Sequence, residues 1–102
     1  MLRVEQTFAK DHPATRGHFP EHPLLPGAFL LDAVIRAIRA QHGLASERVV
    51  VESVKFPRSV RPGQSVLWEL DDPVAGEQGR RVRFRGTTEG ETTVSGTLLF
   101  PN

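Results

Sequence analysis

One segment of this sequence has the pattern of an α-helix, and almost everything around it has the pattern of loop and strand. Residues 28–42 are apolar at most positions around the helical circumference, which is typical of a buried helix. Pro26 and Gly27 mark its start, and Gly43 is placed to end it. The exception among the apolar residues of its first half is Asp32. We therefore expect a buried central helix that carries one carboxylate.

The loop before this helix is stiffened by proline. Within residues 14–27, Pro20, Pro23 and Pro26 are spaced three residues apart. Proline is excluded from helix interiors and central strands. The fixed φ angles limit how His18, which lies in this loop, can move. Apolar residues beside the prolines predict that the loop packs on the core; they are Phe19, Leu24 and Leu25.

The rest of the sequence reads as strands separated by turns. Apolar and polar residues alternate in 65–71 and 80–86, the pattern of half-buried strands. Residues 72–79 are rich in turn formers and are expected to form an open loop. The order of strand, loop, helix and then four strands predicts an α+β fold, in which an antiparallel sheet curls around one long central helix. The expected strands are residues 2–10, 48–56, 65–71, 80–86 and 92–100.

Length and composition limit the classes of protein. At 102 residues, the chain is expected to form one domain over residues 1–102. A net charge of +1 gives no argument for nucleic-acid or membrane binding. There is no cysteine, which excludes disulfides and thiolate chemistry. With no signal-peptide pattern and no membrane-length segment, we expect a soluble, cytoplasmic protein. Its core is small, which predicts pairing with a second copy.

Two titratable residues near the helix start are candidates for chemistry. Histidine titrates near neutral pH, so His18 in an apolar pocket can act as a base. The alternative is a loop histidine that only hydrogen-bonds a carbonyl. Burial of Asp32 would disfavour its charged form and make it a proton donor. The alternative is an ion pair with Arg36, one helical turn further on, that keeps Asp32 charged.

The helix start itself is a candidate for binding an oxyanion. The backbone N–H groups of Gly27 and Ala28 would have no acceptor within the helix, and they would lie at the positive end of its dipole. They can hold a carbonyl oxygen as it gains charge; the alternative is an ordinary helix start. We expect no metal site, because the spacing of the loop's candidate ligands matches no standard zinc pattern. Those ligands are Asp11, His12, His18 and His22.

A basic stripe follows one face of a predicted strand, at Arg81, Arg83 and Arg85. It is either a solvated sheet face or a surface that docks an acidic carrier protein or a phosphate group. No stacking aromatic residues accompany it, so we do not expect nucleic acid as a partner.

The segment around His18 resembles the active-site segment of the beta-hydroxyacyl-(acyl carrier protein) dehydratases. The family motif reads G-H-F-P-x-x-P-x-x-P-G, with Glu or Asp fourteen residues after the histidine. This sequence has Gly17-His18-Phe19-Pro20, Pro23, Pro26-Gly27 and then Asp32. The resemblance continues in Val54-Lys55-Phe56, Arg61-Pro62-Gly63 and Arg83-Phe84-Arg85-Gly86.

This resemblance implies the hot-dog fold and a role for each motif residue. His18 would remove the proton alpha to a thioester carbonyl, Asp32 would protonate or orient the beta-hydroxyl, and the Gly27 N–H would polarise the carbonyl. The substrate would arrive on the phosphopantetheine of acyl carrier protein, with no other cofactor. His18 and Asp32 of one site would come from different protomers of a dimer or higher homo-oligomer. The acyl pocket would be lined by Phe19, Leu24, Leu25 and Phe29.

Two features depart from the family pattern. The family usually has Gln four residues after the helix carboxylate, whereas this chain has Arg36, which would compete for Asp32 if it turned inward. The chain is also shorter than typical members. Two alternatives to a dehydratase therefore stay open: a non-catalytic hot-dog subunit that binds acyl carrier protein or a paralogous dehydratase, and a hot-dog acyl thioesterase. The Gly-His-Phe-Pro motif favours dehydration over hydrolysis.

Overall fold

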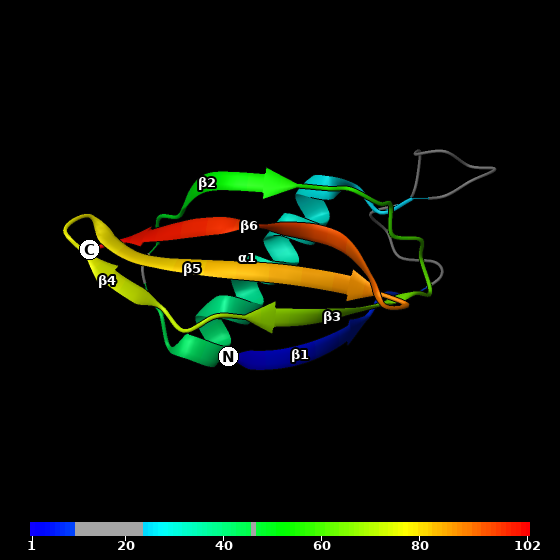
Figure 1. Cartoon of the computed structure of the whole chain (residues 1–102), viewed down its shortest axis with the longest axis horizontal. Helices are drawn as coiled ribbons and strands as arrows, with labels where there is room; N and C mark the ends of the chain where they lie inside the picture. Colours follow the sequence, from blue (N-terminus) through cyan, green and yellow to red (C-terminus); the bar gives the residue numbers. More distant parts are fainter. Residues whose placement is uncertain (10–23, 46) are drawn as a thin grey trace.

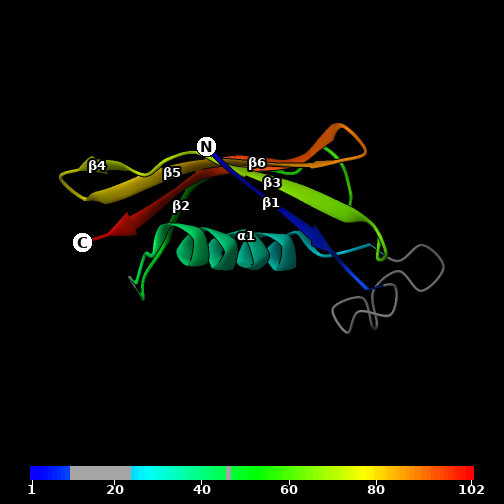
Figure 2. The ribbon, with the colours of Figure 1, turned by 90° about the horizontal axis from the view of Figure 1, so that it is seen from below.

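The computed structural model describes residues 1–9, 24–45 and 47–102. Within these ranges all strand pairings are antiparallel, and the helix lies along one face of the sheet (Figures 1 and 2). This confirms the predicted antiparallel sheet with a single long helix. The elements are β1 (Leu2–Thr7), α1 (Gly27–His42), β2 (Val50–Lys55), β3 (Ser65–Leu70), β4 (Val74–Gly76), β5 (Gly79–Thr88) and β6 (Glu91–Pro101).

The sheet has the strand order β1-β3-β5-β6-β2, with the short β4 beside β5. From β3 to β6 the strands follow one another in the chain through short connections. Strand β2 lies beside β6, at the edge of the sheet opposite β1. Its pairing runs from Val50 opposite Leu99 to Lys55 opposite Ser95, with a bulge between Val51 and Ser53. In the part of the chain that the structure describes, no strand pairs with the outer edge of β2.

The core lies between the sheet and α1. The alternation predicted for β3 is confirmed, because Val66, Trp68 and Leu70 are all fully buried. The indole Nε1 of Trp68 donates a hydrogen bond to the Gln6 side chain on β1 at 3.2 Å. The ring of Trp68 also meets Phe84 of β5 edge-on, at 6.5 Å between ring centres. Burial of these aromatic side chains stabilises the middle of the sheet against the helix.

Helix α1 is buried on one side in the single chain, which is less than the buried central helix that its apolar circumference predicts. Leu30, Ala33, Val34 and Ile38 are buried; they recur at the three- and four-residue spacing of one helix face. The sheet covers that face alone, as Figure 2 shows. The predicted end is confirmed: Gly43 has φ +64° and ψ +30°, and its N–H bonds to the Arg39 carbonyl.

The open loop predicted for residues 72–79 was also wrong. Part of it forms β4, which pairs with the start of β5 through Val74 opposite Arg81 and Gly76 opposite Gly79. Gly76 and Gly79 flank the turn of this hairpin and hid the strand signal, because glycine weakens strands and marks turns. No helix within the described ranges is long and apolar enough to cross a membrane.

Candidate functional site

The described part of the candidate site lies where α1 begins. Residues 10–23 are outside the described residues, and this range contains His18 and Phe19. It also contains Asp11, His12 and His22, which were considered as metal ligands in the sequence. The role of His18 and the stiffness of its loop therefore stay predictions. The structure does describe the segment from Leu24 through Asp32, which brings the second half of the motif into the fold.

The helix begins with open backbone donors. Pro26 is extended, at φ −61° and ψ 142°, and makes no side-chain cap. Its carbonyl accepts the N–H groups of Phe29 and Leu30, at 3.0 and 3.2 Å. Among the described residues, none accepts the N–H of Gly27 or Ala28. Two donors at the positive end of the helix dipole are thus available to an oxygen that gains negative charge.

Phe56, just after β2, packs against the helix start. A Cβ atom on Gly27 would lie 3.1–3.3 Å from atoms of the Phe56 ring, so the motif glycine leaves room for this aromatic side chain. Phe56 is nonetheless 43% exposed. Sequence reasoning quoted Phe56 only as part of the family likeness. No local signal identified it, because single exposed apolar side chains are common on protein surfaces.

A hollow of about 230 Å³ opens beside Gly27 and Phe56. Its inner wall is apolar, because the Leu25, Leu30 and Val60 side chains there are buried. Its remaining described lining is Arg58 and Ser59. This arrangement pairs backbone donors with an apolar wall, which is what a site for an acyl thioester requires.

The predicted acyl-pocket residues do not share one cavity in the single chain. Leu25 lines the hollow beside Gly27. Leu24 instead lines a separate, wider depression. Phe29 packs edge-on against Phe8, at 5.4 Å between ring centres. The predicted pocket is therefore only partly present in the described part of one protomer.

Asp32 lies on the exposed side of α1, and this corrects the expectation that it is buried. Its side chain is 55% exposed, and its Oδ2 accepts a hydrogen bond from Arg36 Nε at 2.9 Å. The reason is geometric: Asp32 is offset from the buried positions Leu30, Ala33 and Val34 and faces away from the sheet. Of the two readings of Asp32, the ion pair with Arg36 is the one found in this chain.

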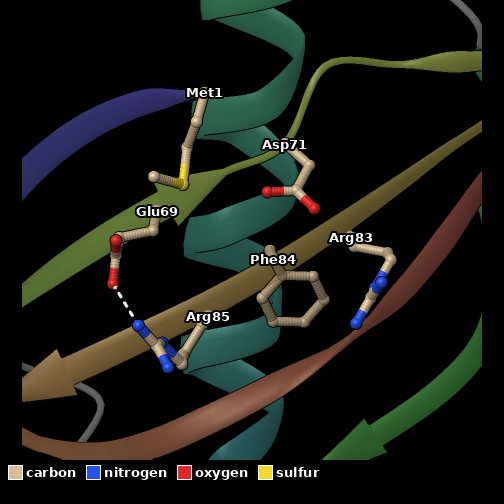
Figure 3. A pocket seen from close by; sticks show the side chains of 6 residues that line it. All are labelled: Met1, Glu69, Asp71, Arg83, Phe84 and Arg85. Atoms are coloured by element: carbon tan, nitrogen blue, oxygen red, sulfur yellow. Dashed lines mark hydrogen bonds and ion pairs between the residues drawn. The ribbon is translucent and has the colours of Figure 1, made fainter.

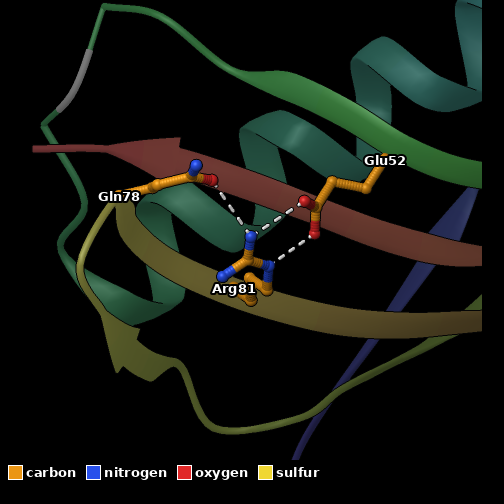
Figure 4. Close-up of polar contacts among 3 residues, drawn as sticks. All are labelled: Glu52, Gln78 and Arg81. Carbon is orange, nitrogen blue, oxygen red and sulfur yellow. Dashed lines mark hydrogen bonds and ion pairs between the residues drawn. The ribbon is translucent and has the colours of Figure 1, made fainter.

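The basic stripe lies on the sheet face that points away from α1. Arg81 binds both oxygens of Glu52 on β2, at 2.7 and 3.0 Å, and also Gln78 (Figure 4). Hydrogen bonding by Arg81 lowers the pKa of Glu52, and the same contact raises the pKa of Arg81. Two of the three stripe arginines are held by carboxylates, since Arg85 binds Glu69 at 2.9 Å.

Arg83 is the exception in the stripe. It forms no ion pair with any described residue, and it lies beside a shallow hollow of about 200 Å³ that it shares with Asp71 (Figure 3). Strands separate this hollow from α1 in the same view. Docking of a carrier on the stripe stays a prediction, and its cationic character in the described structure rests mainly on Arg83.

Nothing in the described ranges gathers three or more potential metal-ligating side chains. The predicted absence of a metal stays a prediction, because the loop histidines lie outside those ranges. The described groups at the helix start that can take part in hydrogen bonding or acid–base chemistry are the backbone N–H groups of Gly27 and Ala28, the Asp32 carboxylate and Arg36.

Comparison with known proteins agrees with the motif. A family model described as ApeI dehydratase, of the ApeI-like family, matches residues 1–97. The 3-hydroxyacyl-(acyl-carrier-protein) dehydratase FabZ of Thermus thermophilus is 33% identical over 99 residues, covering 88% of this chain and 69% of its own length. The FabZ of Xylella fastidiosa is 28% identical over 106 residues, covering 94% of this chain and 62% of its own.

A solved structure shows the same fold. The dehydratase heterocomplex ApeI:P of Xenorhabdus doucetiae superposes with a TM-score of 0.83 and 24% identity, over 98% of this chain and 86% of that one. The hot-dog fold predicted from the motif is thereby confirmed. Because the family model spans nearly the whole sequence and the motif, this chain belongs to the ApeI-like family of dehydratases.

Proposed function

We propose that this protein removes water from beta-hydroxyacyl thioesters carried by acyl carrier protein, giving trans-2-enoyl thioesters for the synthesis of fatty acids or related lipids. The observation that carries the proposal is the start of α1, where two backbone donors have no acceptor among the described residues and Gly27 lines a hollow with an apolar inner wall. Asp32 follows a little over one helical turn later. The FabZ relatives, which are named as acyl-carrier-protein dehydratases, support the choice of substrate.

The reaction divides among the residues as follows. His18 takes the alpha proton, and the negative charge that develops on the thioester oxygen is stabilised by the N–H groups of Gly27 and Ala28. The electron pair of the broken C–H bond forms the C=C bond, and the Cβ–O bond breaks. The departing hydroxide takes up the proton that His18 removed and leaves as water, so the enzyme returns to its starting state. Asp32 contacts the beta-hydroxyl.

A second copy of the chain completes the site in this proposal. No described strand pairs with the outer edge of β2. Val50 and Val51 of this strand, and Phe56 just after it, are each more than 40% exposed, and an unpaired edge strand readily accepts another strand. We infer a homodimer in which His18 and Asp32 of one site come from different copies. Sedimentation velocity of the purified chain tests this, and a monomer at micromolar concentration would contradict it. The reaction is placed in the cytoplasm as part of the same proposal.

The decisive experiment uses the purified protein with a beta-hydroxyacyl thioester of acyl carrier protein, and follows enoyl product and free thiol separately. Enoyl formation is expected, and His18→Ala should lower it by about 10²-fold or more. His42→Ala is the matched control, since His42 lies in the last turn of α1 and should leave the rate unchanged. Thiol release without enoyl product would identify a thioesterase instead. Tight carrier binding without turnover would identify a non-catalytic subunit.

A further inference from the structure

The ion pair on the exposed face of α1 has a consequence for the chemistry of Asp32. Arg36 Nε holds Asp32 Oδ2 at 2.9 Å, and the two side chains are 78% and 55% exposed. No other described residue forms an ion pair with Asp32. Asp32 is also the sixth residue of the helix, beyond the first turn in which the helix dipole acts strongly. Among the described residues, Arg36 is therefore the positive charge that acts on this carboxylate.

This contact gives the two carboxylate oxygens of Asp32 different hydrogen-bonding environments. Oδ2 accepts the hydrogen bond from Arg36, and no described residue bonds Oδ1, which is the oxygen left for a substrate hydroxyl or a water. The bond from Arg36 is a charge-assisted one between a guanidinium and a carboxylate. A carboxylate accepts hydrogen bonds and has no proton to give. The contact thus suits an acceptor that orients the beta-hydroxyl, and it opposes the role of proton donor.

Arg36 has further hydrogen-bond donors besides the one in this contact. Arginine has five N–H donors, and only Nε is used on Asp32. The other donors extend from the same exposed face, next to the carboxylate. Water screens this pair in the single chain, so the contact contributes little there. Cover by a second copy would remove that water and strengthen the contact.

We infer that Arg36 is a positioning residue, which fixes Asp32 as a charged acceptor for the beta-hydroxyl of the substrate. The inference rests on the proposed dehydratase function. In this arrangement the alpha proton taken by His18 is the one returned to the leaving hydroxide, so one proton leaves the substrate and the same proton leaves with the water. Asp32 neither gains nor loses a proton over the cycle.

The sign of one substitution tests this inference. If Arg36 positions an acceptor, Arg36→Gln should lower kcat by about tenfold, and KM should stay within about twofold. Arg36→Lys keeps the charge and should recover most of the loss. If Asp32 were instead a proton donor held back by Arg36, Arg36→Gln would raise kcat. A raised or unchanged kcat overturns the inference.

A matched control separates the loss of one surface charge from a specific effect. Arg3→Gln removes an exposed arginine that also pairs with a carboxylate, Glu69 at 3.7 Å, on β1. It should leave kcat unchanged, and thermal unfolding of all variants shows that they are folded. If the unmodified protein gives no enoyl product, the proposed function fails. If it is active and Arg36→Gln does not lower kcat, only the inference about Arg36 fails.

Discussion

The start of α1 and the outer face of the sheet use charge in opposite ways. On the outer face, Arg85 of β5 is held by Glu69 of the neighbouring β3, and Arg81 of β5 is held by Glu52 of β2, on the far side of β6. At the helix start, two backbone N–H groups have no acceptor among the described residues, and an aromatic ring lies half-exposed beside them. Apart from Arg83, the arginines of the outer stripe are paired within the sheet, whereas the donors at the helix start have no described acceptor.

This difference separates a stabilising surface from a candidate binding surface. Cross-strand ion pairs contribute modestly to sheet stability and leave little net charge for a ligand. Open helix N–H groups next to an apolar hollow contribute little to stability, but they are ready to bind an oxygen. We therefore expect substitutions at the helix start to change activity, and substitutions in the sheet to change stability or titration.

The largest effect is expected from replacing Asp32. Asp32→Asn removes the negative charge from the candidate site and should lower kcat/KM by about 10²-fold or more. The same change at Asp71, which is exposed beside the outer hollow, should leave kcat/KM unchanged. Steady-state kinetics on a carrier-bound thioester measures both. Equal losses in the two variants would remove the distinction between the two regions.

Two Gly→Ala substitutions, one in the sheet and one at the helix start, compare the same regions by the free energy of unfolding. A Cβ on Gly86 of β5 would lie 2.7–2.9 Å from side-chain atoms of Trp68 and Val66, which are fully buried. Gly86→Ala should therefore lower the free energy of unfolding by about 1–3 kcal/mol.

Gly27→Ala is the counterpart at the helix start. Its Cβ would lie 3.1–3.3 Å from the Phe56 ring, and this half-exposed ring has room to move. Its free energy of unfolding should stay within about 1 kcal/mol of the unmodified protein. Urea unfolding compares the two variants, and similar losses at both glycines would contradict the idea that the helix start is loosely packed.

The smallest effect is a titration on the outer face. Hydrogen bonding by Arg81 lowers the pKa of Glu52, and hydrogen bonding by Arg85 lowers that of Glu69. A lowered pKa in the folded state means that each pair stabilises the fold above the unfolded pKa, about 4.3. That contribution is lost as the pH falls through the lower folded value.

Arg81→Gln should therefore raise the pKa of Glu52 toward its usual value and leave Glu69 as it was. Carboxyl NMR titration measures both groups in one sample, so Glu69 serves as the internal control. A Glu52 pKa that does not respond to the substitution would show that Arg81 does not hold it in solution.

Local patterns predicted much of the fold. The alternation of Val66, Trp68 and Leu70 identified the inner face of β3, and Gly43 identified the end of α1; the structure confirms both. Such patterns succeed because side-chain direction repeats with the period of the strand or helix. The hairpin with β4 was missed, because a short exposed strand with a terminal glycine has no such pattern.

The candidate site was predictable only in part. The motif placed Gly27 at the helix start, where the structure has it. The contact of Phe56 with Gly27 joins residues far apart in the sequence, and no local pattern predicts which side chain of a distant strand will reach a helix end.

The helix, the longer strands and the dehydratase motif were predictable from the sequence alone, because each of these depends on neighbouring residues or on fixed spacing. The tertiary structure decided what those elements face. The apolar helix had several faces that a sheet could have covered, and the sheet covers the one opposite Asp32. Asp32 consequently lies in solvent in the single chain, within reach of Arg36. The helical spacing allowed this ion pair, but only the packing of the helix against one side of the sheet selected it.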